Sequence, residues 1–211
     1  MRNFSLTVLV GAVALALVSC QKAQTPPPQP APDYHVVGTI KEVMQGIVDP
    51  SSDVIFDSVA TNVTAQGIEE KRPQNDEEWA TVQHNALMLA EAANLLKMPG
   101  RQVAREGEKT KSEGPDAPEL TREEIYAKIN GDRGKFYGHA DELQQTAIRA
   151  LQAAQKHDVQ GLFDVGDDID MACEGCHLEY WYPKDSAARA SYEEAVKEKA
   201  AEKAKAQQEK K

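Results

Sequence analysis

A long run of apolar residues at alternating steps of four and three constrains the fold of this chain more than any other feature. Its members are Phe136, Ala140, Leu143, Ala147, Ala150, Ala154 and His157. Residues at this spacing share one face of an α-helix, whereas a half-buried β-strand would alternate at every second residue. We therefore predict a helix over about 132–157 that buries one narrow, alanine-rich face against other helices.

Two earlier stretches carry the same helical spacing. The stretch over 76–98 has its apolar stripe at Trp79, Val82, Ala86, Leu89, Ala93 and Leu96. Asp76 or a neighbour is suited to cap this helix, and Pro99-Gly100 ends it. A stretch that begins at about 36 places Val37, Ile40, Met44 and Ile47 on one face. Asp49-Pro50 interrupts that stretch, and the helix is expected to resume over 51–60 after a kink.

A fourth amphipathic stretch follows a short turn over 158–161 and ends near Tyr182-Pro183. Its apolar face holds Leu162, Val165, Ile169, Ala172, Cys173 and Cys176. The short turn makes this helix an antiparallel neighbour of the preceding one. A capping-box sequence at Thr121 also predicts a short helical piece that ends at about Ile129. Four amphipathic helices and no strand pattern predict an all-α protein, an antiparallel four-helix bundle over 36–183.

Two other segments do not contribute to this core. Residues 101–120 are polar, with two glycines and two prolines. They predict a long loop, suited to a lid or a docking surface. Residues 184–211 are mostly Ala, Lys and Glu, and they predict a solvated helix without an apolar face. A coiled-coil or partner-binding segment is the alternative for this tail.

The N-terminus has the pattern of an export signal. A short start with Arg2 precedes an apolar stretch that is shorter than the roughly 20 residues of a membrane-spanning helix. Leu17-Val18-Ser19-Cys20 resembles the bacterial lipobox, which implies that residues 1–19 are removed and that Cys20 is lipidated. The alternatives are an ordinary signal peptide with a chance cysteine, or an uncleaved anchor. Residues 20–35 then form the lipidated, proline-rich linker. We expect an exported bacterial lipoprotein on the periplasmic side, and Gln21 favours the outer membrane.

Composition excludes several other classes of protein. The net charge of −10 and the pI of about 5.0 argue against a nucleic-acid-binding protein. The mean hydropathy of −0.56 excludes a polytopic membrane protein. Three cysteines are too few for a disulfide-rich scaffold or a four-cysteine zinc site. No Ser-His-acid pattern, phosphate-binding glycine loop or helical zinc-protease motif is present, so the sequence does not predict an enzyme.

Cys173-Glu174-Gly175-Cys176-His177 is the most informative motif in the chain. C-x-x-C-H is the attachment sequence of c-type haem, an iron porphyrin. On a helix the two thiols and the imidazole share one face, so Cys173 and Cys176 are placed to form thioethers with the porphyrin. His177 is then placed to ligate the iron. A redox-active dithiol and a zinc site are the alternatives for the same residues.

A bundle of four helices with C-x-x-C-H on the last one resembles the cytochrome c-prime family, the class II c-type cytochromes. The resemblance covers about 36–183, and the leader, the 101–120 loop and the charged tail depart from the family. The run Cys173 to Pro183 also resembles a subgroup of exported cytochrome c proteins. The resemblance implies one covalent haem c with iron, electron carriage rather than catalysis by side chains, and a homodimer formed through the first two helices.

In this family the first helix covers the second face of the haem. Members with a methionine there carry electrons with six-coordinate iron. Members with an apolar residue there keep five-coordinate iron and bind nitric oxide or carbon monoxide. Met44 lies on the first stripe and is the candidate iron ligand, which the resemblance places opposite His177. The alternative role of Met44 is packing, because methionine fills irregular gaps in cores.

The remaining histidines and methionines are weaker candidates for iron ligation. His35 precedes the first helix. His84 lies off the apolar stripe of the stretch over 76–98, and His139 lies beside the stripe of the helix over 132–157. His157 closes that stripe, and Met88, Met98 and Met171 are interpreted as packing residues. Tyr180, Trp181 and Tyr182 are expected to pack on a porphyrin edge or on the end of the bundle.

An acidic cluster precedes the C-x-x-C-H motif. Asp167, Asp168 and Asp170 form either a solvated face or a docking patch for a basic redox partner.

Overall fold

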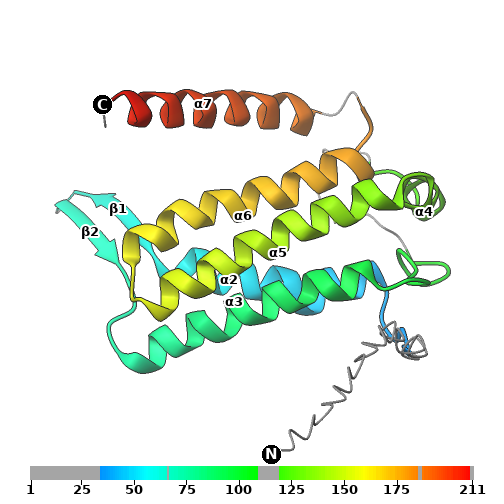
Figure 1. Ribbon diagram of the computed structural model, residues 1–211, viewed down its shortest axis with the longest axis horizontal. Coiled ribbons are helices and arrows are strands. Elements are labelled where there is room, and N and C mark those ends of the chain that lie inside the picture. Colours follow the sequence, from blue (N-terminus) through cyan, green and yellow to red (C-terminus); the bar gives the residue numbers. More distant parts are fainter. Residues whose placement is uncertain (1–33, 66, 109–118, 185–186, 210–211) are drawn as a thin grey trace, which may run out of the picture. The chain divides into compact units, whose positions relative to one another are not determined.

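Helices make up most of the computed structural model, which describes residues 34–65, 67–108, 119–184 and 187–209 (Figure 1). The prediction of an all-α protein is confirmed at the level of fold class. The signal peptide over 1–19, Cys20 and most of the linker lie outside the described residues, as do residues 109–118 of the 101–120 loop. Among the described helices, none is both long enough and apolar enough to cross a membrane.

The first helical stretch runs without a break through Pro50, so the predicted interruption is wrong. It consists of α1 (Ile40–Val43), the π-helix η1 (Met44–Val48) and α2 (Asp49–Ser58). Pro50 has no N–H to donate to the carbonyl of Gly46, and its ring crowds that carbonyl. The wider turn of η1 accommodates this proline, since the N–H of Asp49 bonds the carbonyl of Met44 instead.

The start of this stretch also differs from the prediction. Thr39 caps α1 in a capping box with Glu42. Val37 therefore lies before the helix, and it is 84% exposed instead of being part of the stripe.

A short β-hairpin follows α2, although no strand was predicted. Strands β1 (Ala60–Thr64) and β2 (Gly67–Lys71) pair antiparallel, with Val63 opposite Ile68. These strands are short and largely exposed, so they lack the alternation of buried and exposed residues that marks a strand in a sequence.

Helices α3, α4, α5 and α6 each begin at a side-chain cap. Asn75, not Asp76, caps α3 (Asp76–Lys97), and Thr121 forms the predicted capping box of α4 (Arg122–Gly131). Asp132 caps α5 (Arg133–Gln155), and Asp158 caps α6 (Val159–Tyr180). The long helices therefore begin and end close to the predicted positions.

The long helices pack side by side, with α5 against α3 and α6, and with α2 also against α3 and α6 (Figure 1). The predicted stripe of α5 is buried from Phe136 to Ala154. His157 departs from it, because α5 ends at Gln155 and His157 has a left-handed φ of 53°. Its exposed ring stacks on Trp79 at 4.6 Å between centroids.

Residues 101–104 are not the solvated loop that their polarity predicted. Arg101, Val103 and Ala104 are buried. The guanidinium of Arg101 donates to the carbonyls of Leu95 and Gly38, and the N–H of Ile40 donates to the carbonyl of Gln102 at 2.8 Å. This segment thereby fixes the start of the first helical stretch against the end of α3.

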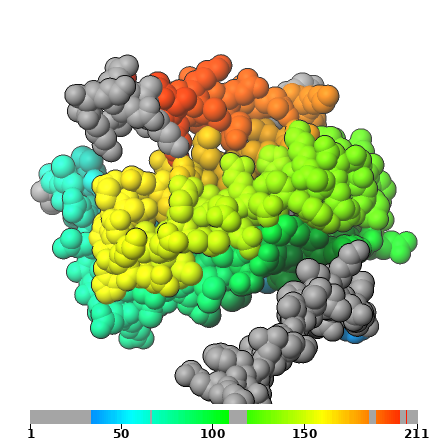
Figure 2. Space-filling model, viewed as in Figure 1, coloured from blue at the N-terminus to red at the C-terminus, as the bar shows by residue number. Residues whose placement is uncertain are grey.

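The charged tail forms α7 (Ala187–Glu209), as predicted, but it also contacts α6. Arg189 donates to the carbonyl of Leu178 at 2.7 Å, and Lys199 pairs with Asp168 at 2.6 Å. In the space-filling view, the orange and red side chains of α7 lie against α6 (Figure 2). The tail is therefore only partly solvated.

Candidate functional site

The three residues of the C-x-x-C-H motif lie on the last turns of α6 and line one cavity. Cys173, Cys176 and His177 are half-buried, and the two cysteines are free thiols. The cavity has a volume of about 350 Å³, within the roughly 300–1,000 Å³ of cofactor pockets. The helical spacing therefore brings the three side chains to one face, as the sequence predicted.

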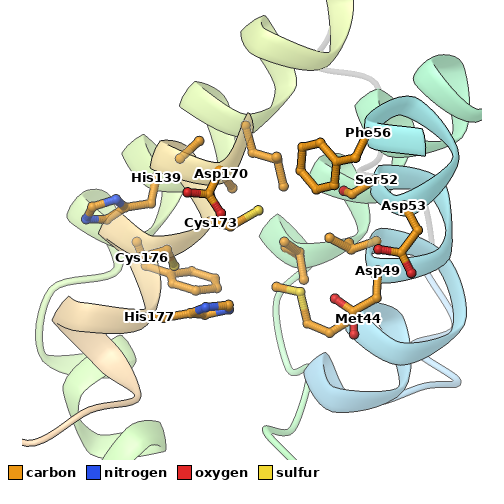
Figure 3. Close-up of a pocket in the computed structure, with 16 residues that line it drawn as sticks. Met44, Asp49, Ser52, Asp53, Phe56, His139, Asp170, Cys173, Cys176 and His177 are labelled. Atoms are coloured by element: carbon orange, nitrogen blue, oxygen red, sulfur yellow. The ribbon is translucent and has the colours of Figure 1, made fainter. Parts of the chain in front are cut away.

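The first helical stretch forms the facing wall. Met44 begins η1, and Val48, Ser52 and Phe56 follow at steps of four along η1 and α2. Figure 3 shows Met44 and His177 on opposite sides of the cavity, both directed into the space between the helices. The predicted pairing of these two residues on facing walls is thus present in the geometry.

Apolar side chains close the base of the cavity. They come from α3, α5 and α6, and they are Leu96, Phe136, Ala140, Leu143 and Ala172. All of them are buried. Alanines at two of these positions leave room that larger side chains would fill, and the apolar surface excludes water from whatever occupies the cavity.

Two buried polar atoms in the cavity wall have no hydrogen-bond partner among the described residues. They are the hydroxyl of Ser52, whose residue is only 5% exposed, and Nδ1 of His139. The hydroxyl of Tyr180, which does not line the cavity, also lacks a partner among the described residues, and its ring packs edge-on against His139. Buried polar groups are normally hydrogen-bonded, so the Ser52 and His139 atoms are available to polar groups of a ligand.

Glu174 orients the imidazole of His177. Its Oε1 lies 3.4 Å from Nδ1 of His177. This contact suits the tautomer with its proton on Nδ1, in which Nε2 has a free lone pair. A carboxylate in contact with the second nitrogen is typical of metal-ligating histidines.

The two thiols are protonated in this environment. Burial raises the pKa of Cys173 and of Cys176 to about 12. Nucleophilic and disulfide-exchanging cysteines require a lowered pKa and a thiolate. The alternative of a redox-active dithiol therefore lacks the electrostatic environment that it needs.

Carboxylates surround the opening of the cavity. Burial raises the pKa of Asp49 and of Asp170, and neighbouring acids add to this effect. Asp168 differs: burial opposes its ionisation, but hydrogen bonds from Lys199 and Arg149 lower its pKa overall. Within the acidic cluster predicted from the sequence, basic side chains thus pair with Asp168, whereas Asp170 has acidic neighbours that raise its pKa further.

The other candidate residues lie away from the cavity. His35, His84 and His157 are exposed, and none of them lines it. Met98 contacts Arg101 through its sulfur. Met171 is half-buried, whereas Met88 is 37% exposed, so its interpretation as a packing residue is wrong. Tyr180 packs on Phe136 and His139, and Trp181 lies near His177.

Sequence reasoning missed Ser52 as a residue of the site and gave His139 only as a weaker candidate. Ser52 lies two helical steps of four beyond Met44, and this spacing could have indicated it. His139 was placed correctly beside the stripe of its helix, but only the packing of α5 against α6 shows that it reaches the cavity.

Within the described part of the chain, no three His, Cys, Asp or Glu side chains are grouped so as to hold a metal ion. Comparison with protein-family models, curated proteins and solved structures finds no match for this chain.

Proposed function

We propose that this protein is a c-type cytochrome that binds one haem in the cavity between α6 and the first helical stretch. Thioethers at Cys173 and Cys176 hold the porphyrin, and His177 ligates the iron. The observation that carries the proposal is that all three residues line one apolar cavity with Met44 on its facing wall. A metal cluster of protein side chains is not needed, because the porphyrin supplies four of the iron ligands.

The residues present fit this group. The motif supplies two thiols and an imidazole on one helix face, and the unpartnered atoms of Ser52 and His139 suit the polar substituents of a porphyrin. The finer fold belongs to the same proposal: α2, α3, α5 and α6 form an antiparallel four-helix bundle of the cytochrome c-prime type.

The bound haem would supply one-electron chemistry at its iron. Met44 provides a thioether ligand, which favours ferrous iron and raises the potential. Glu174 orients His177, and the apolar base of the cavity keeps water away from the iron. We propose electron transfer as the function, with the protein exported and tethered to the outer membrane through lipidated Cys20.

The experiment is to express the full chain in a host that attaches haem c, and to measure the intact mass of the denatured protein. The proposal expects each chain to carry the added mass of one haem. The double variant Cys173→Ala/Cys176→Ala should carry none. Wild-type protein with the mass of the polypeptide alone would refute covalent attachment.

A five-coordinate haem that binds a small gas such as nitric oxide is a second candidate. The unpartnered hydroxyl of Ser52 favours it, because this hydroxyl lies on the same wall as Met44 and could donate to a bound diatomic ligand. The visible spectrum separates the two candidates, since six-coordinate His/Met iron is low-spin and five-coordinate iron is high-spin.

A further inference from the structure

The seam between α2 and α6 contains two adjoining cavities. One is the cavity of the candidate site. The second has a volume of about 320 Å³ and is lined by Ile55, Val59, Leu162 and Gly166, among others. Phe56 and Asp170 line both, so the two cavities adjoin, and they are treated together as one groove along α2 and α6.

Unneutralised carboxylates line this groove. Asp49 and Asp53 come from α2, and Asp167 and Asp170 come from α6. All four residues are exposed. Among the described residues, no Lys or Arg lines either cavity, whereas nearby Asp168 is paired with Arg149 and Lys199 at 2.6 Å each. The groove is therefore a local concentration of negative charge, beyond the net charge of −10 of the whole chain.

The groove also has an apolar centre. Phe56 lines both cavities together with the carboxylates and is 38% exposed. An apolar centre with a charged rim is the usual composition of a protein-binding surface. Complementary charge steers association, and it does so most at low ionic strength.

We propose that the α2–α6 groove, defined by Asp49, Asp53, Phe56, Asp167 and Asp170, is the docking surface for a redox partner with a positively charged surface. The proposal rests on the proposed haem site, because docking there brings the partner to the open edge of that cavity. A second copy of this chain is a poor occupant, since two negatively charged grooves repel each other. The proposed surface thus differs from the patch of Asp167, Asp168 and Asp170 predicted from the sequence, because it omits Asp168 and spans two helices.

The test compares two small oxidants of opposite charge. Ferrous haem-loaded protein gives one electron either to tris(phenanthroline)cobalt(III), a cation that becomes cobalt(II), or to hexacyanoferrate(III), an anion that becomes hexacyanoferrate(II). The measured quantity is the ratio of the two second-order rate constants. A change of haem potential alters both rate constants in the same direction, so it changes their ratio less than it changes either rate constant.

The triple variant Asp49→Asn/Asp53→Asn/Asp170→Asn should lower the cation-to-anion ratio by about tenfold at low ionic strength, at the small end of steering effects. The effect should disappear at high salt. A matched control, Glu77→Gln/Glu91→Gln/Glu106→Gln, removes the same charge from exposed residues that line none of the cavities described. Equal ratios in the two variants would overturn the docking surface.

A second readout does not depend on electron transfer. Hexaamminechromium(III), a redox-inert paramagnetic cation, should broaden the amide NMR signals of Asp49, Asp53 and Asp170 before those of the control residues Glu77, Glu91 and Glu106. Uniform broadening would refute the groove as a cation-binding surface. If no haem is attached, the proposed function fails, and this measurement on the same chain still decides whether the groove attracts a cation.

Discussion

Met44 is the residue on which the assignment of six-coordinate iron depends. Its side chain faces His177 across the cavity, and no other methionine lines that cavity among the described residues. We predict that Met44→Ala converts a low-spin spectrum into a high-spin one, because loss of the thioether leaves an open iron position. Visible absorption of the ferric and ferrous protein measures this directly.

Met88 provides the matched control for this substitution. It is an exposed methionine of α3, and Met88→Ala should leave the spectrum unchanged. A low-spin spectrum that persists in Met44→Ala would remove Met44 as a ligand and leave it as a packing residue.

At the residue scale, the sequence predicted that the C-x-x-C-H side chains share one face, but it did not predict the rest of the cavity wall. Cys173, Cys176 and His177 are fixed by local spacing on one helix, and Met44 follows from the stripe and the resemblance. The roles of Ser52 and His139 depend on which polar atoms lose their partners when helices from distant parts of the chain pack together. That outcome is not encoded in local spacing.

At the scale of elements, η1 sets the direction of Met44. If Pro50 maintains the π-helical turn, Pro50→Ala restores a donor for the carbonyl of Gly46 and favours a regular α-helix. Met44 would then rotate by about 100° relative to α2, the rotation per residue of an α-helix. We predict a smaller low-spin fraction in Pro50→Ala, measured by visible absorption.

Pro99→Ala is the control for this prediction, because Pro99 lies beyond the end of α3 and outside the cavity. A wild-type spectrum in Pro50→Ala would show that packing, and not the proline, maintains η1.

Helices α6 and α7 approach each other closely at Gly175, within the C-x-x-C-H motif. A Cβ at Gly175 would lie 2.9 Å from the hydroxyl of Tyr192, closer than side chains pack. We predict that Gly175→Ala displaces α7, so that trypsin cleaves this lysine-rich helix several times faster. Tyr192→Phe removes the clashing oxygen, and the double variant should recover most of the protection. Equal cleavage of wild type and Gly175→Ala would contradict this contact.

Sequence patterns were sufficient to predict the long helices. The stripes of α3 and α5 could be predicted because a long amphipathic helix repeats its pattern many times, and the cap of α4 could be predicted from its local capping-box motif. The hairpin β1–β2 was missed because two exposed strands of five residues carry no such pattern. The continuity through Pro50 was missed because a π-helical turn has no sequence signature.

At the scale of the whole molecule, we expect the carboxylates of the α2–α6 groove to lower the free energy of unfolding at neutral pH. The pKa of Asp49 and of Asp170 is raised in the folded state, mainly by burial. Such groups favour folding when protonated, and this contribution is lost as the pH rises through their folded pKa. We predict that Asp49→Asn/Asp170→Asn raises the Tm at pH 7 by roughly 1–2 °C, as for favourable surface substitutions.

The increase should vanish well below pH 3.8, the ordinary pKa of Asp, because both carboxyls are then protonated in the folded and unfolded states alike. Thermal unfolding followed by circular dichroism at several pH values measures this trend. A Tm difference independent of pH would contradict the electrostatic explanation.

The central claim is that this chain carries one haem c bound through Cys173 and Cys176. The pyridine haemochrome spectrum of the purified, denatured full chain tests it most directly, because the spectrum distinguishes haem with both vinyl groups converted to thioethers from free haem. We expect one haem c per chain, and we expect that acidified acetone does not extract this haem. A chain without haem, or with haem that is fully extracted, would contradict it.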